Sequence, residues 1–174
     1  CTIKPELIEH YKNRTGHYKA LISDERIMQT ENIDMSCIEV ILPLGLHKKT
    51  KLFHRAIVTV GGVTGTGKTM FALNFIRDNM HNHDLYYLNS EMSEQELKAK
   101  KDAFLHIPAY SWCFNPIEVV GDMSLSIRTN KINIIDYLSA PPEKPYLIRE
   151  QLDAIKGRLG TGMALVLIQR KSGN

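Results

Sequence analysis

The sequence predicts an α/β fold in which a mostly parallel sheet carries helices on both faces, preceded by a small N-terminal segment. Two observations predict it. A glycine-rich motif lies between a strand pattern and a helix pattern in residues 56–80. Further along the chain, apolar runs of strand length alternate with helical periodicity, which is typical of parallel strands joined by crossover helices.

The glycine-rich motif predicts a phosphate-binding loop. Residues 56–60 form a short β-branched run, and residues 62–69 then fit G-x-x-x-x-G-K-[ST]. Glycines let backbone N–H groups turn inward around an oligophosphate at the positive end of the following helix. The Lys68 ammonium would reach the β- and γ-phosphates, and the Thr69 hydroxyl would bind Mg²⁺. The alternative is a glycine-rich turn with a chance lysine, but the flanking strand and helix favour a nucleoside triphosphate site.

Size, charge and cysteine content limit the class of protein. At 174 residues and 43% hydrophobic, the chain can bury one substantial core. A net charge of +3 neither demands nor excludes a nucleic-acid partner. The three cysteines form no C-x-x-C pair and the histidines show no metal spacing, which indicates a reducing compartment without a disulfide framework or zinc site. Because no apolar run reaches membrane-spanning length, we expect a cytoplasmic protein without a membrane partner.

The first part of the chain is expected to be separate from the main domain. Residues 6–11 are predicted to end a short helix, residues 13–16 to form a turn and residues 17–21 a strand. This pattern fits either the end of a winged-helix module or an ordinary surface hairpin, and the hairpin is favoured. Residues 23–36 are polar and aperiodic, which is typical of a linker. The start at Cys1 rather than Met indicates a fragment or a trimmed product.

We therefore expect an N-terminal segment and linker at residues 1–36 and the main domain at residues 37–174. Residues 38–42 are apolar enough for a docking strand or turn of the main domain. The basic run at residues 47–51 either contacts phosphates or forms a solvated loop, and the loop is favoured.

The remaining elements of the main domain follow from local patterns. Ser93 and Glu96 form a capping box, so a helix is expected from there towards residue 105, before Pro108. A second helix is predicted at residues 147–159, where apolar residues recur on one helical face. Further strands are predicted at residues 84–89, 110–114, 132–136 and 163–168.

Polar residues stand at the ends of several predicted strands. In a parallel sheet the carboxyl ends of the strands form the functional edge. Asp136 suits the acidic residue that holds Mg²⁺, Glu91 suits a general base for the attacking water, and Gln169 suits a hydrogen-bond donor to the γ-phosphate that reports its loss. The alternatives are that Asp136 caps the next turn, that Glu91 caps the following helix and that Gln169 is an ordinary polar residue at a strand end.

These motifs resemble the RecA-like P-loop ATPase core, and more closely the DnaB-type replicative helicases and their phage relatives. The resemblance covers roughly Leu42 to Lys171. Glu-Met-Ser at residues 91–93 and Ile-Asp-Tyr-Leu at residues 135–138 are characteristic of that branch. Beyond the strand that corresponds to the one ending at Gln169, the family continues with DNA-binding loops and an arginine finger. We expect this chain to lack that C-terminal portion.

The resemblance implies ATP and Mg²⁺ as cofactors. By position, it assigns Thr69 and Asp136 to Mg²⁺, Glu91 to the catalytic glutamate and Gln169 to the γ-phosphate sensor, with Lys68 also catalytic. The nucleotide is expected to contact the loop and the residue after it: Gly62, Val63, Thr64, Gly65, Thr66, Gly67, Lys68, Thr69 and Met70.

The resemblance also implies a motor that hydrolyses ATP between the subunits of a homo-oligomer, a hexameric ring, and moves on single-stranded DNA during DNA replication. A second hypothesis from another class is a RecA/KaiC-like recombinase, switch or assembly module without unwinding activity. A kinase-type phosphotransferase is less favoured, because no motif for a lid or for binding a phosphate acceptor is recognisable in the sequence.

Overall fold

A computed structural model describes residues 8–10, 18–20, 30–141 and 143–169. The chain divides into two compact units, Cys1–Asp34 and Met35–Asn174. In the first unit, β1 (Ile8–His10) pairs antiparallel with β2 (Tyr18–Ala20). The strand expected at residues 17–21 is therefore confirmed where it is described.

The helix expected at residues 6–11 is wrong, because Ile8–His10 is a strand. A run of six residues covers less than two helical turns, so it is too short for periodicity to separate helix from strand. The turn expected at residues 13–16 lies outside the described residues, and so do residues 23–29 of the linker expected at residues 23–36.

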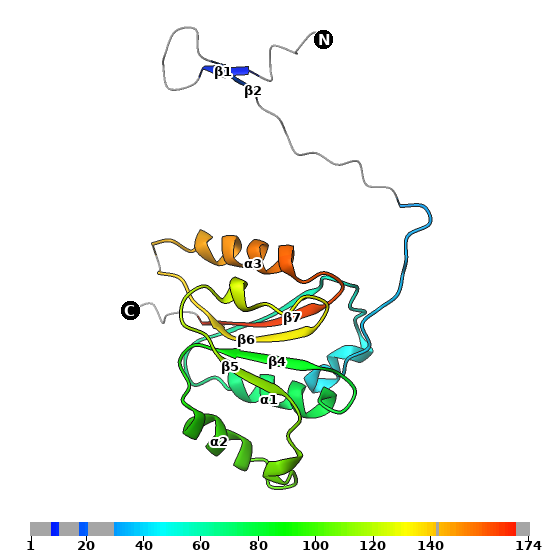
Figure 1. Cartoon of the computed structure of the whole chain (residues 1–174), viewed down its shortest axis with the longest axis vertical. Coiled ribbons are helices and arrows are strands. Elements are labelled where there is room, and N and C mark those ends of the chain that lie inside the picture. Colours follow the sequence, from blue (N-terminus) through cyan, green and yellow to red (C-terminus); the bar gives the residue numbers. More distant parts are fainter. Residues whose placement is uncertain (1–7, 11–17, 21–29, 142, 170–174) are drawn as a thin grey trace. The chain divides into compact units, whose positions relative to one another are not determined.

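The second unit is built on a five-stranded sheet in which every pair is parallel, so the unit has an α/β fold (Figure 1). The order across the sheet is β3-β7-β6-β4-β5. The strands are β3 (Ile57–Gly62), β4 (Leu85–Asn89), β5 (Asn115–Glu118), β6 (Ile132–Leu138) and β7 (Met163–Gln169). Four of them match predicted strands, while β5 does not.

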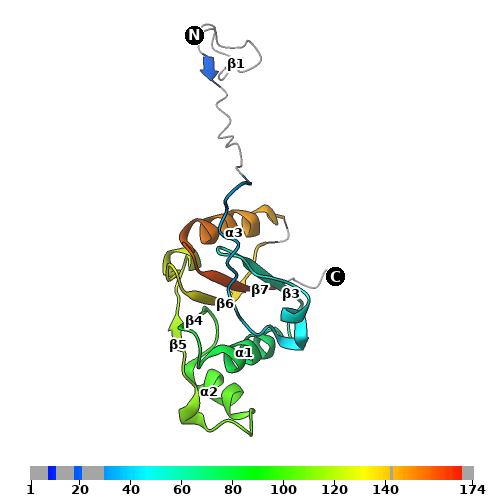
Figure 2. The same cartoon turned by 90° about the vertical axis from the view of Figure 1, so that its right-hand side faces the viewer.

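Helices cover both faces of the sheet. Helix α3 (Tyr146–Arg158) lies on one face, and α1 (Lys68–Asn79) and α2 (Glu94–Asp102) lie on the other (Figures 1 and 2). The alternation along β7 explains the two layers: Leu165 packs in the cluster that contains α1, whereas Val166 packs in the cluster that contains α3. The predicted capping box is also confirmed, since Ser93 and Glu96 make both of its hydrogen bonds.

The strand expected at residues 110–114 is wrong. Residues Ala109–Ser111 form a 3-10 turn, and the strand begins only at Asn115. The aromatic residues that suggested a strand pack on one another instead, with the Trp112 ring centroid 5.2 Å from that of Phe104 and 6.0 Å from that of Phe114. The true strand contains Pro116, which an edge strand such as β5 tolerates because its outer side needs no N–H donor.

Residues 38–42 dock on the end of α1 without forming a helix or strand. The Asn79 side chain accepts from Ile41 N at 2.8 Å and donates to Ile41 O at 2.9 Å, and Leu42 is buried in the core. The chain then forms a 3-10 helix, η2 (Pro43–Lys48). Within the described ranges, no helix is both long and apolar enough to cross a membrane.

Candidate functional site

A pocket of about 520 Å³ lies at the carboxyl ends of four neighbouring strands, β3, β7, β6 and β4. The loop after β3 and the start of α1 line one side of it, and the segment from the end of β4 into α2 lines the other. Four side chains that the sequence singled out line this pocket together: Lys68, Glu91, Asp136 and Gln169.

The loop at residues 62–67 uses its glycines where the backbone needs them. Gly65 and Gly67 have φ angles of +80° and +86°, in the left-handed region that favours glycine. At Gly62 a Cβ atom would lie 2.6 Å from Thr66 Oγ1, which is too close for any contact. The same Thr66 hydroxyl donates to Val63 O at 2.8 Å, so the loop is closed tightly on itself.

Lys68 is the first residue of α1, and its side chain returns over the loop. Its Nζ donates to Val63 O at 2.8 Å, and the residue is only 9% exposed. Thr69 follows it and lines the same pocket. An ammonium group and a hydroxyl group therefore stand at the N-terminus of a helix, whose partial positive charge favours anions.

Asp136 is held by a buried tyrosine from the neighbouring strand. Tyr87 is fully buried, and its hydroxyl donates to Asp136 Oδ2 at 2.6 Å. Burial, and then the charge of Asp136, raise the pKa of Tyr87 well above its usual range, so the phenol keeps its proton and acts as a donor. This bond fixes the orientation of a carboxylate that is itself only 4% exposed.

The oxygen groups of this pocket fit Mg²⁺. The Thr69 hydroxyl and the Asp136 carboxylate both line it, and Mg²⁺ binds through one or two such groups together with waters and substrate phosphates. In the described residues, no group of three or more His, Cys, Asp or Glu could hold a metal. A bound ion at this pocket would therefore take most of its ligands from phosphate and water.

Glu91 follows β4 in a turn that Asn89 shapes. The Asn89 side chain accepts from Met92 N at 3.0 Å and donates to Met92 O at 2.5 Å. Glu91 itself is exposed, and its Oε1 accepts from Tyr137 Oη at 2.5 Å. Since the cap of α2 is Ser93, Glu91 is not needed to cap that helix.

Tyr137 therefore positions Glu91 in the pocket. Burial, followed by the hydrogen bond to Glu91, raises the pKa of Tyr137 to about 12. The phenol accordingly remains a hydrogen-bond donor to the carboxylate at neutral pH.

Gln169 contacts the glycine-rich loop directly. Strand β7 lies between β3 and β6, and Gln169 stands opposite Gly62 in the β3–β7 register. Its Nε2 donates to Thr64 Oγ1 at 2.9 Å. A change in the conformation of the loop at Thr64 would therefore alter this hydrogen bond at the end of β7.

Three polar residues of the site were missed by the sequence reasoning: Tyr87, Asn89 and Tyr137. Tyr87 lies in an apolar strand run and is indistinguishable from an ordinary core aromatic until its partner across the sheet is known. Asn89 could have been found, because it is a polar residue at a strand end like Asp136.

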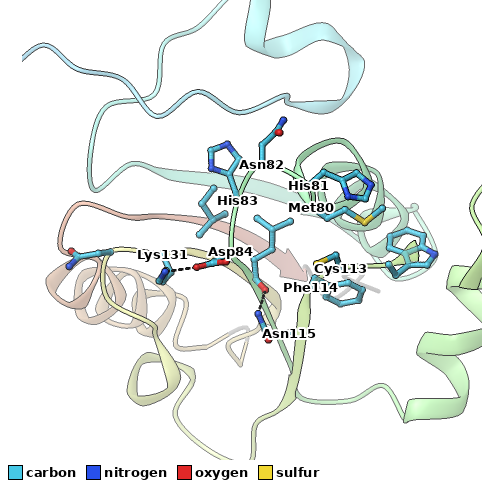
Figure 3. A pocket seen from close by; sticks show the side chains of 13 residues that line it. Met80, His81, Asn82, His83, Asp84, Cys113, Phe114, Asn115 and Lys131 are labelled. Atoms are coloured by element: carbon cyan, nitrogen blue, oxygen red, sulfur yellow. Dashed lines mark hydrogen bonds and ion pairs between the residues drawn. The ribbon is translucent and has the colours of Figure 1, made fainter. Parts of the chain in front are cut away.

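A larger pocket of about 730 Å³ lies at the opposite edge of the sheet, beside the amino ends of β4 and β6 (Figure 3). Its charged groups are already paired, since Lys131 Nζ lies 2.5 Å from Asp84 Oδ2. His83 is also bonded, with its Nε2 at 2.7 Å from Glu39 O. The glycine loop and the strand-end carboxylates instead line the pocket at the carboxyl edge, which is the better candidate for a phosphate site.

No protein-family model matches this chain, and no curated protein sequence matches it. The resemblance to RecA-like and DnaB-type proteins therefore stays a prediction from the motifs.

Proposed function

We propose that this chain binds ATP with Mg²⁺ and hydrolyses it, as the motor domain of a DnaB-like helicase that acts on single-stranded DNA in replication. The observation that carries the nucleotide part of this proposal is the pocket in which the glycine loop and Lys68 meet Glu91, Asp136 and Gln169. The helicase part rests on the resemblance of residues 91–93 and 135–138 to that family.

Each residue has a distinct role in this proposal. The loop amides and Lys68 hold the β- and γ-phosphates, while Thr69 and Asp136 hold the metal ion. Thr69 and Asp136 would hold Mg²⁺ beside the phosphates, where its positive charge would offset the charge that develops on the phosphate oxygens. Glu91, oriented by Tyr137, would orient the attacking water and accept its proton.

A second candidate function is an ATP-dependent switch or assembly module without unwinding activity. The hydrogen bond between Gln169 and Thr64 favours it, because this bond connects the end of β7 to the loop that would hold the phosphates. Loss of the γ-phosphate would then change the position of Gln169 at the end of β7, whether or not DNA is present.

Steady-state ATP hydrolysis, measured with and without single-stranded DNA over a wide range of protein concentration, separates these functions. A DNA-stimulated rate that rises steeply with protein concentration supports a motor acting between subunits of a ring. ATP binding with turnover indifferent to DNA supports the switch. Absence of nucleotide binding would contradict both.

The close approach of the Thr66 side chain to Gly62 gives one test of the loop. Gly62→Ala is expected to weaken ATP binding by about tenfold. The new Cβ forces the stiff Thr66 side chain away from Val63 O. The loop then loses the hydrogen bond between them, and the Thr66 side chain adopts a strained rotamer. Calorimetric titration with MgATP measures the change. Gly61→Ala is the matched control, since a Cβ there meets nothing within 4 Å. Equal affinities of the two variants would contradict the assigned loop.

The Tyr137 hydroxyl gives a test of catalysis that is separate from binding. Tyr137→Phe is expected to lower kcat for ATP about tenfold or more, because Glu91 loses a hydrogen bond of the charge-assisted kind. The Kd for MgATP should stay within about twofold, since the phosphate-binding groups are unchanged. Tyr146→Phe, on an exposed tyrosine of α3, is the control and should alter neither quantity. A variant with full turnover would show that Glu91 does not depend on this bond.

A further inference from the structure

Helix α2 carries three lysines in different surroundings. Lys98 is 70% exposed in its side chain and pairs with Asp102 at 2.5 Å. Lys101 lies over the Trp112 and Phe114 rings, with Nζ at 5.9 and 5.6 Å from their centroids. Lys100 is half-buried and lines the candidate nucleotide pocket. Lys98 and Lys101 therefore have close partners, whereas Lys100 has only a weaker electrostatic interaction with Glu96 on the same helix.

Lys100 stands on the side of the pocket that faces the glycine loop. That side consists of the turn after β4 and the α2 residues Glu96 and Lys100, which are one helical turn apart on the same face. The Lys68 ammonium belongs to the other side, where it donates to Val63 O. Among the described pocket residues, Lys100 is thus the cation that α2 contributes.

The hydrogen bonds from Ser93 lower the pKa of Glu96 more than the nearby charge of Lys100 does, so Glu96 is only a weak partner of this ammonium. Its Oε2 accepts from Ser93 N at 2.8 Å and from Ser93 Oγ at 2.9 Å, so this carboxylate is used in the capping box. None of the ion pairs found in the described part of the chain involves Lys100. The ammonium therefore remains available to an anion in the pocket.

The charges of the pocket indicate what that anion would be. Three carboxylates line it, those of Glu91, Glu96 and Asp136, against two ammonium groups, Lys68 and Lys100. Without Lys100, the charged groups that the α2 side presents to the outer oxygens of a phosphate chain held by the loop would all be carboxylates. A phosphate that reaches across the pocket needs a cation on the α2 side. The negative charges of phosphate and carboxylate repel each other strongly where they are partly shielded from water.

We propose that Lys100 binds the outermost phosphate of the nucleotide from the α2 side of the pocket and thereby selects a nucleoside triphosphate over the diphosphate. The inference rests on the proposed nucleotide site and adds the residue that distinguishes its two ligands. Lys68 holds the phosphate chain from the loop, whereas Lys100 contacts only the group that the diphosphate lacks.

Binding of MgATP and MgADP to the wild-type chain and to Lys100→Gln tests this assignment by calorimetry. Loss of one charge-assisted contact is expected to raise the Kd for MgATP roughly 10- to 100-fold and to leave the Kd for MgADP within about twofold. Lys98→Gln is the matched control on the same helix and should change neither affinity. Lys100→Arg should keep the preference for MgATP, because a guanidinium also binds phosphate.

The outcomes separate the inference from the function on which it rests. If the wild-type chain binds neither nucleotide, the proposed function and the role of Lys100 are both overturned. If it binds both nucleotides and Lys100→Gln weakens them equally or not at all, only the role of Lys100 is overturned. An arginine variant that loses selectivity as fully as the glutamine variant would overturn it too, since the packing of α2 rather than the cation would then matter.

Discussion

Glu91→Gln is expected to abolish most ATP turnover, by roughly 10²–10⁴-fold, while the Kd for MgATP stays within about twofold. The amide keeps the size of the side chain, and its Oε1 can still accept from Tyr137 Oη, so the pocket should keep its shape. It cannot accept a proton from the attacking water, because an amide oxygen is a very weak base. Single-turnover hydrolysis measured beside equilibrium binding separates the two effects.

Glu94→Gln is the control for this experiment. Glu94 lies in the first turn of α2, three residues after Glu91, and it does not line the pocket. The Glu94→Gln variant should hydrolyse ATP at the wild-type rate. A normal rate in Glu91→Gln would move the general base to another residue, and a parallel loss of affinity would mean that Glu91 acts in binding rather than in the chemical step.

The parts of the fold that sequence predicted correctly are those specified locally. The run from the β-branched residues 56–60 through the glycines to α1 contains its own signals, and so does the capping box of Ser93 and Glu96. The common edge for Glu91, Asp136 and Gln169 followed from one assumption, a parallel sheet, because parallel strands end at the same side.

The contacts inside the site depended on strand order, which the local patterns did not specify. The position of β7 between β3 and β6 brings Gln169 beside Thr64. The β4–β6 pairing likewise brings Tyr87 to Asp136. Such partners are separated by 49 to 105 residues along the chain.

The errors have a related cause. Residues 110–114 are aromatic enough for a strand, yet Trp112 packs between the rings of Phe104 and Phe114, and the pairing segment is the less typical Asn115–Glu118. β propensity measures fit to a half-buried surface, and an aromatic cluster is also such a surface. The positions of the apolar residues were therefore predicted correctly, but the backbone conformation of residues 110–114 was not.

Lys68→Met is the second large effect, and it is expected in binding rather than in chemistry. Loss of the ammonium removes charge-assisted contacts to two phosphates, so the Kd for MgATP should rise roughly 100-fold or more. The fold should survive, since methionine replaces the buried stem and Val63 O keeps its bond from the Thr66 hydroxyl at 2.8 Å. Thermal unfolding of the variant should accordingly lie within a few degrees of the wild type.

Lys98→Met, an exposed lysine of α2, is the control and should leave ATP binding unchanged. Unchanged affinity in Lys68→Met would contradict the phosphate-binding loop itself, whereas joint loss of affinity and thermal stability would mean that Lys68 serves the fold. Lys68→Met and Glu91→Gln together test two separate functions, because the two side chains line one pocket from opposite sides. If the lysine variant loses nucleotide and the glutamate variant keeps it without turnover, binding and hydrolysis are separable functions of this single pocket.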